Sequence, residues 1–181
     1  MILGYTDKVI SYDCVDAATD WTYNTHGGDY YLGVADLDGD GVAEIAFAKY
    51  DSIGVLDDDG TELWWNDYAG TSAYLYQDAS YEIEDIEFGD FDGDGDLDVA
   101  MGAYYGVNLR LLDSMTGDEI IAGVVIDGYG WWTTQIAVGD FDGRSKDEVA
   151  ANSFQALGVF GAPPPPIPTG KSTDAGGISK D

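Results

Sequence analysis

The chain is poor in basic residues: 7 Lys and Arg stand against 35 Asp and Glu among its 181 residues, giving a formal net charge of -28. Nucleic acids and anionic membranes bind through basic surface, so neither is an expected partner. No apolar run approaches the roughly 20 residues that a membrane-spanning helix requires, and membrane insertion is not expected. Cations and basic surfaces are the partners that this charge favours.

Two residue types with distinctive chemistry are almost absent. Cys14 is the sole cysteine, which excludes a disulfide within the chain and predicts a small buried residue, with an intermolecular bridge as the less favoured alternative. His26 is the sole histidine and lies in a polar THGGD segment without a nucleophile motif, so we interpret it as a solvated loop residue. Carboxylate pairs of the kind used in glycoside hydrolysis are common in so acidic a chain. Their dense clusters are better explained by metal binding, and no enzymatic activity is expected.

One motif occurs three times along the chain. The copies are VADLDGDGVAEIAFA, FGDFDGDGDLDVAMGA and VGDFDGRSKDEVAAN, which begin at Val34, Phe88 and Val138. Their first loop aspartates, Asp36, Asp90 and Asp140, are spaced by 54 and then 50 residues. That period is typical of propeller blades and not of helical solenoids.

The residues around each acidic loop predict strands. An alternating segment precedes the loop and an apolar run such as EIAFA or DVAMGA follows it, the pattern of short strands bounded by Gly and Asp. SIGVLDDDGTELWWN and VNLRLLDSMTGDEIIAG each predict a strand, a turn and a strand. Because no segment has a helical period, we predict an all-β fold of three propeller-type blades, each of about four antiparallel strands. Propellers close with four to eight blades, so this is a partial propeller or one that other chains complete.

The chain divides into three parts. Residues 1–29 are predicted to hold strands that complete a blade, residues 30–161 the three repeats (about 30–79, 80–129 and 130–161), and residues 162–181 a Pro-rich linker or tail. The third repeat ends after ALGVFG without an outer strand, and DKVISYDCVDAATDWTYN supplies a candidate for it. We expect this segment to complete the third blade of its own chain or, the favoured case, of a neighbour in a head-to-tail polymer.

Carboxylates occupy alternate positions of the first two acidic loops. Counted from the first aspartate, positions 1, 3, 5 and 9 of loop one are Asp36, Asp38, Asp40 and Glu44. The same positions of loop two are Asp90, Asp92, Asp94 and Asp98. Oxygen donors on alternate residues, with Gly at position 6 for a sharp turn, suit Ca²⁺, which accepts about six to eight oxygen ligands. We predict two calcium sites, to which Val42 and Asp96 contribute backbone carbonyls at position 7.

Other interpretations of these loops are weaker. An EF-hand begins in the same way, but it needs flanking helices and a bidentate Glu at position 12, where this chain has Phe47, Met101 and Ala151. Mg²⁺ suits an all-protein cage less well than Ca²⁺. A solvated acidic turn without metal is the remaining alternative for loops one and two.

Loop three departs from the pattern. It keeps Asp140, Asp142 and Glu148, but Arg144 stands at position 5 and Ser145 at position 6. The guanidinium is expected to pair with Asp140 or Asp142 and to stand in for the ion. A calcium ion is therefore not the favoured expectation for loop three.

The segment FGDFDGDGDLDVAMGAYYG, from Phe88 to Gly106, resembles the FG-GAP, or VCBS-type, repeats of integrin α-subunit propellers and of many microbial surface proteins. It carries a Gly-Asp entry, a DxDxDGxxD loop and a trailing Gly-Ala. The resemblance covers residues 30 to 160 and is weaker in loop three. It implies β-propeller blades with calcium in the loop between the first two strands, an extracellular or cell-surface location, and a role in adhesion or ligand binding.

The expected function is therefore that of a non-catalytic calcium-binding module with a protein or glycan ligand. Trp64, Trp65, Trp131 and Trp132 could form a lectin surface, but a WW pair in a strand more simply places one ring in the core and one on the opposite face. A third hypothesis is a structural subunit of a surface fibre or layer, assembled from copies of the chain. The start MILGYTDKVISYD lacks the layout of a secretory signal, which fits a cytoplasmic chain or one whose signal was removed. Adaptation to high salt is a second possible cause of the acidity.

Overall fold

The computed structural model describes residues 1–4, 7–25, 31–49, 52–68, 83–103, 109–124, 133–153 and 157–161. These residues form fourteen strands joined by turns, without a helix, which confirms the all-β prediction. No helix with the length and hydropathy needed to cross a membrane is found among them. Trp131, Trp132, His26 and the tail from residue 162 lie outside the described residues.

The strands form four antiparallel sheets, each in chain order. Sheet 1 contains β1 (Ile2–Gly4), β2 (Lys8–Tyr12) and β3 (Thr19–Asn24). Sheet 2 contains β4 (Tyr31–Ala35), β5 (Glu44–Lys49), β6 (Ser52–Leu56) and β7 (Glu62–Asp67). Sheet 3 contains β8 (Ile83–Gly89), β9 (Asp98–Ala103), β10 (Leu109–Leu112) and β11 (Glu119–Val124). Sheet 4 contains β12 (Thr133–Gly139), β13 (Glu148–Ser153) and β14 (Leu157–Phe160).

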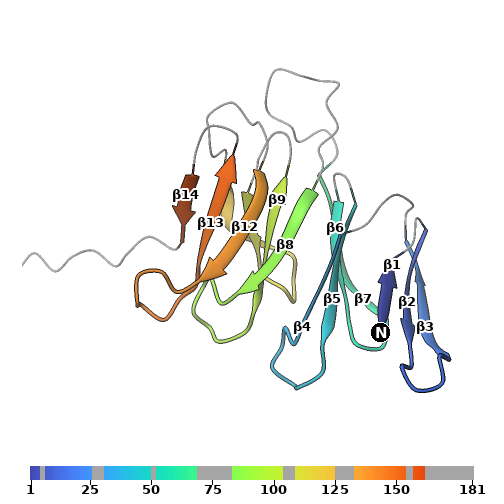
Figure 1. Cartoon of the computed structure of the whole chain (residues 1–181). Coiled ribbons are helices and arrows are strands. Elements are labelled where there is room, and N and C mark those ends of the chain that lie inside the picture. The colour runs from blue at the N-terminus through green and yellow to red at the C-terminus, as the bar shows by residue number, and fades with distance from the viewer. Residues whose placement is uncertain are drawn as a thin grey trace, which may run out of the picture.

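The four sheets follow one another in a row, from the blue N-terminal sheet to the orange and red C-terminal sheet (Figure 1). An apolar cluster fills each of the three junctions. Val9 and Phe47 belong to the cluster between sheets 1 and 2, and Val55 and Met101 to the cluster between sheets 2 and 3. A third cluster joins sheets 3 and 4. Within the described part of the chain, the row closes into neither a barrel nor a propeller.

The position of a strand between two neighbouring sheets explains its sequence. Every residue of β9 is buried, and so is every residue of β5 except the last. A strand that is covered on both faces is apolar at successive residues instead of alternate ones. The runs EIAFA and DVAMGA are therefore the strands that lie inside the row.

The N-terminal strands form a sheet of their own. β2 pairs with β1 on one side and with β3 on the other, and among the described residues none of these strands joins sheet 4 of the same chain. The structure thus has four sheets where three blades were predicted, and pairing with sheet 4 of another chain stays a prediction. Cys14 lies in the turn between β2 and β3 and is exposed, so the prediction of a buried cysteine is wrong.

Two tryptophans make hydrogen bonds and close ring contacts between neighbouring sheets. Trp64 Nε1 donates a hydrogen bond of 2.6 Å to the Ser114 carbonyl in the β10–β11 turn. A Cβ on Gly117 of that turn would lie 2.7 Å from the Trp64 ring, so the ring lies directly on the glycine. Trp21 of sheet 1 contacts Gly60 in the β6–β7 turn of sheet 2 in the same way.

The two adjacent tryptophans of β7 lie on opposite faces, as predicted. Trp64 is 8% exposed and belongs to the cluster between sheets 2 and 3. Trp65 packs against the cluster between sheets 1 and 2 and stacks on Phe47, with ring centroids 5.2 Å apart. Both rings serve the packing of the sheets, and neither forms an exposed sugar platform.

Candidate metal centre

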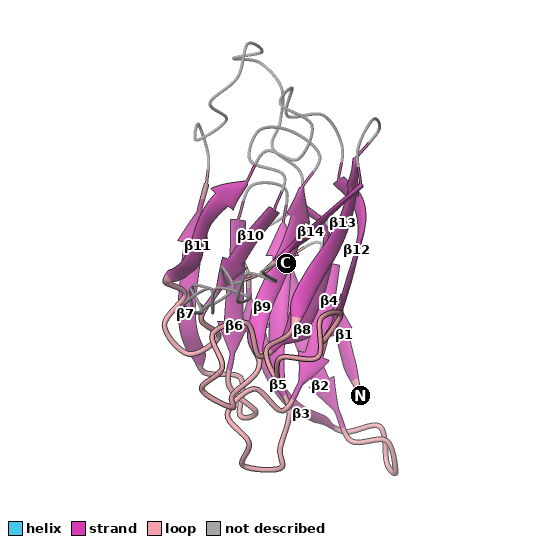
Figure 2. Cartoon of the chain, turned by 90° about the vertical axis from the view of Figure 1, so that its left-hand side faces the viewer, coloured by secondary structure: helices cyan, strands magenta, loops and turns pink. Residues whose placement is uncertain are grey.

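The three acidic loops join β4 to β5, β8 to β9 and β12 to β13, and the described loops gather mainly at one end of the strands (Figure 2). Positions 4 and 6 have positive φ in every loop: 76° and 92° at Gly39 and Gly41, 85° and 103° at Gly93 and Gly95, and 75° and 68° at Gly143 and Ser145. The predicted sharp turn at position 6 is confirmed. Loop three makes the same turn without glycine there, at a cost of roughly 1 to 2 kcal/mol.

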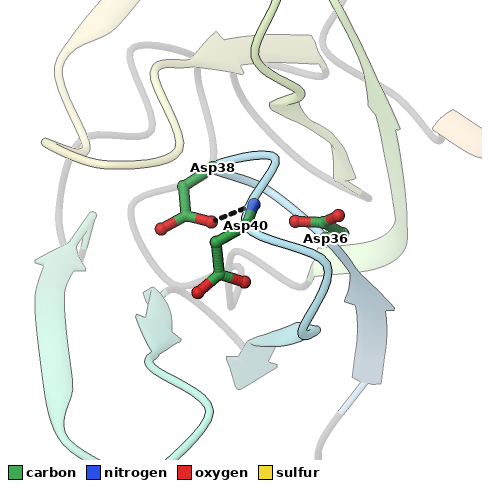
Figure 3. Close-up of side chains that lie close together, drawn as sticks. All are labelled: Asp36, Asp38 and Asp40. Carbon is green, nitrogen blue, oxygen red and sulfur yellow. Dashed lines mark hydrogen bonds between the residues drawn. The ribbon is translucent and has the colours of Figure 1, made fainter.

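Loop one brings its first three aspartates together. Carboxylate oxygens of Asp36, Asp38 and Asp40 lie within 4.8 Å of one another, and Figure 3 shows the three side chains on one turn of the loop. Asp38 accepts a hydrogen bond of 3.0 Å from the N–H of Asp40, and Asp36 accepts one of 3.0 Å from Gly41. The backbone N–H groups hold the carboxylates in place but do not neutralise three like charges.

Loop two repeats this arrangement. Asp90, Asp92 and Asp94 form a second group within 4.8 Å. Asp90 accepts from Gly93 N–H at 2.6 Å, and Asp92 accepts from Asp94 N–H at 3.0 Å. The structure therefore assembles the carboxylates at positions 1, 3 and 5 in both loops where a metal was predicted.

The acid at position 9 has a different contact. Leu37 N–H donates to Glu44 Oε2 at 2.7 Å, and Phe91 N–H donates to Asp98 Oδ2 at 3.0 Å. Glu44 and Asp98 are only 2% and 4% exposed. Each leaves its second carboxylate oxygen outside this bond, and neither belongs to the group of three within 4.8 Å.

Burial makes these two acids resist ionisation. Desolvation raises the pKa of Glu44, and the charges of Asp38 and Asp40 add to the effect. Desolvation likewise raises the pKa of Asp98 to about 7, with further contributions from the charges of Asp92, Asp94 and Asp113. The charged form of a buried acid beside other carboxylates destabilises a fold unless a cation accompanies it.

Loop three assembles a different group. Asp140, Asp142 and Glu148 lie within 4.8 Å of one another, and Phe141 N–H donates to Glu148 Oε2 at 2.8 Å. Arg144 Nε lies 3.3 Å from Asp142 Oδ2, so one of the two predicted ion pairs is present. Desolvation acts to raise the pKa of Asp140, but hydrogen bonds from backbone N–H groups, among them that of Gly143, outweigh it and hold this pKa below its usual value.

Contacts between loops were not predicted from the sequence. Leu97 N–H of loop two donates to the Leu37 carbonyl of loop one at 3.3 Å. Asp147 N–H of loop three donates to the Asp90 carbonyl of loop two at 2.9 Å, and Asp147 Oδ2 accepts from Asp90 N–H at 3.1 Å. Lys146 Nζ donates to the Asp92 carbonyl. In loops two and three, the backbone N–H at position 8 thus donates a hydrogen bond to the preceding loop.

Two further features of the loops and turns bear on metal binding: the backbone groups at position 7 and a fourth group of acids. The N–H groups of Val42 and Asp96 donate to Asp40 and Asp94 at 2.7 and 3.0 Å, and the metal-binding role predicted for their carbonyls stays a prediction. A fourth acidic group, Asp57, Asp58 and Asp59 in the β6–β7 turn, also lies within 4.8 Å. Only a turn was predicted from the sequence for this DDD run.

The residues of loop one fit a cation. Asp36 Oδ1 is buried and has no hydrogen-bond partner among the described residues, although an unpaired buried carboxylate oxygen is costly. It belongs to a group of three carboxylates, and hard oxygen donors of this kind favour Ca²⁺, Mg²⁺ or Mn²⁺ over softer metals. The acidic groups of loops one and two could therefore hold a metal ion.

Comparison with solved structures gives similarity of fold. The rhamnogalacturonan lyase YesW matches with a TM-score of 0.54 at 24% identity, over 83% of this chain and 26% of that protein. Bacillus licheniformis rhamnogalacturonan lyase PL11 matches with a TM-score of 0.52 at 21% identity, over 83% of this chain and 35% of that protein. This chain therefore spans about a quarter to a third of the length of these two enzymes, and at such identities the likeness concerns the all-β fold alone.

The biofilm matrix protein Bap1 of V. cholerae matches with a TM-score of 0.48 at 20% identity, over 82% of this chain and 22% of that protein. This score is too low to support a shared architecture. No family model matches the chain, and no curated protein matches it. The resemblance to FG-GAP repeats stays a prediction that depends on the loop residues.

Proposed function

We propose that this chain is a non-catalytic, extracellular calcium-binding repeat module, in which calcium stiffens the junctions between sheets. Asp36, Asp38, Asp40 and Glu44, with the Val42 carbonyl, would hold one ion. Asp90, Asp92, Asp94 and Asp98, with the Asp96 carbonyl, would hold a second. Bound calcium would supply the positive charge that a chain with so few basic residues lacks.

The unpartnered Oδ1 of Asp36, a buried atom in a group of otherwise exposed carboxylates, carries this proposal for loop one, and loop two follows by its matching geometry. A solvated acidic turn would leave each carboxylate oxygen in water, where it has hydrogen-bond partners. Here the fold instead removes one oxygen from water beside Asp38 and Asp40. It also buries Glu44 at position 9. This arrangement is costly without a cation and favourable with one.

The acidic loops are connected to the packing between the sheets. The residue at position 2, Leu37 or Phe91, is fully buried and packs in the cluster shared with the next sheet. Its N–H is held by the acid at position 9. Carbonyls of positions 1 and 2 accept from the following loop. A metal ion that holds the loop carboxylates in place would therefore also restrain the buried residue at position 2, which packs against the next sheet.

A stiff row of sheets is suited to adhesion or ligand binding at a cell surface. The proposed partner is a protein or glycan ligand or another copy of the chain. The polysaccharide-lyase activity of the similar structures is not transferred here, since the dense acidic groups are assigned to the cation. Trp64 and Trp65 are used in packing, which removes two of the four tryptophans on which a lectin surface was suggested.

Calorimetric titration with Ca²⁺ tests the proposal. The wild type is expected to bind two ions, and the variants Asp36→Ala and Asp94→Ala one each. Asp142→Ala should retain both, because Arg144 already pairs with Asp142. Asp16→Ala, in the β2–β3 turn, is the matched control for loss of an exposed aspartate.

Absence of heat from calcium binding, together with a melting temperature that EDTA does not change at low salt, would overturn the proposal. Equal losses of bound calcium in Asp94→Ala and Asp142→Ala would show that loop three is a full site. Mg²⁺ at the same concentration serves as the competing cation and is expected to bind more weakly.

A further inference from the structure

We propose that the outer face of sheet 4, the face turned away from sheet 3, binds sheet 1 of a second copy of this chain, so that copies stack head to tail. The proposal concerns packing of sheet faces and does not depend on calcium binding or on exchange of strands. It follows from comparing the same repeat position in sheets 2, 3 and 4.

The register defines equivalent residues on the third strand of each sheet. Val55 of β6 pairs with Ala46, Leu111 of β10 with Ala100, and Val159 of β14 with Ala150. Two residues earlier, Ile53, Leu109 and Leu157 are likewise equivalent, opposite Ala48, Gly102 and Asn152. These positions form the face that sheets 2 and 3 turn toward the following sheet.

In sheets 2 and 3 that face is covered. Ile53 and Val55 are 0% exposed and pack in the cluster with Met101 of sheet 3. Leu109 and Leu111 are 1% and 2% exposed and pack with Ile136 of sheet 4. The repeat therefore uses large apolar residues here to bind the next sheet.

In sheet 4 the same positions are apolar but uncovered. Leu157 is 77% exposed and Val159 is 59% exposed. The loop residue at position 2 follows the same rule, since Leu37 and Phe91 are fully buried whereas Phe141 is 53% exposed. Residues at three equivalent positions thus change from buried to exposed together, and they lie on one face.

A hollow borders this face. It has a volume of about 480 Å³ and is lined by Ala150, Asn152 and Leu157 of sheet 4 together with Asp85 and Glu87 of β8 in sheet 3. In the junction between sheets 2 and 3, the facing positions Ala46 and Ala48 are covered by side chains of the following sheet.

Sheet 1 carries the matching face. Each later sheet has one face that packs against the sheet before it in the chain, here called its receiving side. This side carries Ile45 and Phe47 in sheet 2 and Val99 and Met101 in sheet 3. The register places Leu3 opposite Ile10, as Phe47 lies opposite Gly54, so Leu3 is the equivalent of Phe47. Since Ile2 packs toward sheet 2, Leu3 points to the other face, where it is half-buried beside Ile10, which is 9% exposed. Met1, on the same side, is 59% exposed.

The three junctions between sheets of this chain indicate what covers the open face of sheet 4. Every such face that is covered within the chain is covered by another sheet of the same repeat, and sheet 1 is the described sheet whose receiving side has no sheet on it. A second copy supplies it in the required orientation. Because the two faces differ, each copy retains one free face of each kind and the assembly extends.

Analytical ultracentrifugation of the full chain over a concentration series, with calcium held constant, tests this stacking. The wild type is expected to gain mass as concentration rises. Leu157→Asp blocks the sheet 4 face and Leu3→Asp the sheet 1 face, and each variant alone should stay monomeric. Val34→Asp, at a 51% exposed position on β4 of sheet 2, is the control and should associate as the wild type does.

Mixing the two blocked variants gives the decisive result. Leu157→Asp still has sheet 1 and Leu3→Asp still has sheet 4, so the mixture should form a complex of twice the monomer mass and grow no further. Val159→Asp repeats the test if Leu157→Asp loses its circular dichroism spectrum. A wild type that stays monomeric throughout, or a Leu157→Asp variant that associates like the wild type, would overturn the proposal. Pairing by Leu3→Asp alone with no complex in the mixture would show sheet 4 bound to sheet 4 and would overturn it as well. Calcium titration of the same samples separates these outcomes from failure of the proposed function.

Discussion

Replacing Asp98 by Asn is expected to stabilise the metal-free protein and to remove calcium binding by loop two. The Asp98 side chain is 4% exposed and accepts a hydrogen bond from Phe91 N–H. The charges of Asp92, Asp94 and Asp113 act on it. Asn keeps an acceptor oxygen for Phe91 but removes the negative charge, so the substitution isolates the cost of that charge.

The magnitude follows from the pKa of Asp98. Burial raises this pKa from 3.8 to about 7, and one pKa unit corresponds to about 1.4 kcal/mol. The charged carboxylate therefore lowers the free energy of unfolding by roughly 4 kcal/mol above pH 7. Since solvent reaches the neighbouring loop and screens part of this cost, we expect Asp98→Asn to gain about 2 to 4 kcal/mol in metal-free buffer.

The pH dependence has a defined sign. The folded state binds the Asp98 proton more tightly than the unfolded chain does, so this residue favours folding below pH 3.8 and the advantage is lost as pH rises toward 7. The wild type in EDTA is expected to lose stability relative to Asp98→Asn across this interval. With calcium bound, the charged form has a partner and the difference should reverse.

Urea unfolding in EDTA and in calcium, at pH 5 and pH 8, measures both effects. Glu148→Gln is the matched control, because Glu148 accepts the same hydrogen bond from Phe141 but is half-buried, and a change within about 0.5 kcal/mol is expected. An Asp98→Asn variant that is less stable than the wild type in EDTA at pH 8 would refute the reasoning. So would one that still gains full stability from calcium.

Two further predictions concern the junctions between sheets. Gly117→Ala and Gly143→Ala both place a Cβ at a φ near 75°, which costs about 1 to 2 kcal/mol. Gly117→Ala should lose roughly 1 to 3 kcal/mol more, because its Cβ meets Trp64 whereas that of Gly143 meets nothing within 4 Å. Equal losses in thermal melts would disprove the contact. Phe91→Ala should cost about 3 to 5 kcal/mol and Phe141→Ala less than about 1 kcal/mol in dilute monomer, since only Phe91 is fully buried. Urea midpoints measured side by side test this, and similar costs would contradict the assigned burial.

The acidic loops were predictable because their information is local. Aspartates at alternate positions and glycines at positions 4 and 6 fix the turn, and the structure assembles Asp36, Asp38 and Asp40 within 4.8 Å as that pattern requires. The role of position 9 was only partly predictable. Its contact with the N–H of position 2 depends on the burial of Glu44 and Asp98, which no spacing within the loop expresses.

The sequence by itself determined the strands, the turns and the places where carboxylates gather, since each depends on residues a few positions apart. Tertiary structure decided how each strand is used. Leu157 and Leu109 occupy the same repeat position with the same side chain, yet they are 77% and 1% exposed. The WW pair predicted one ring on each face of β7, but only the neighbouring sheet shows that Trp64 packs on Gly117 of the β10–β11 turn. Burial depends on whether another sheet lies opposite, and a repeat carries the same local pattern in either case.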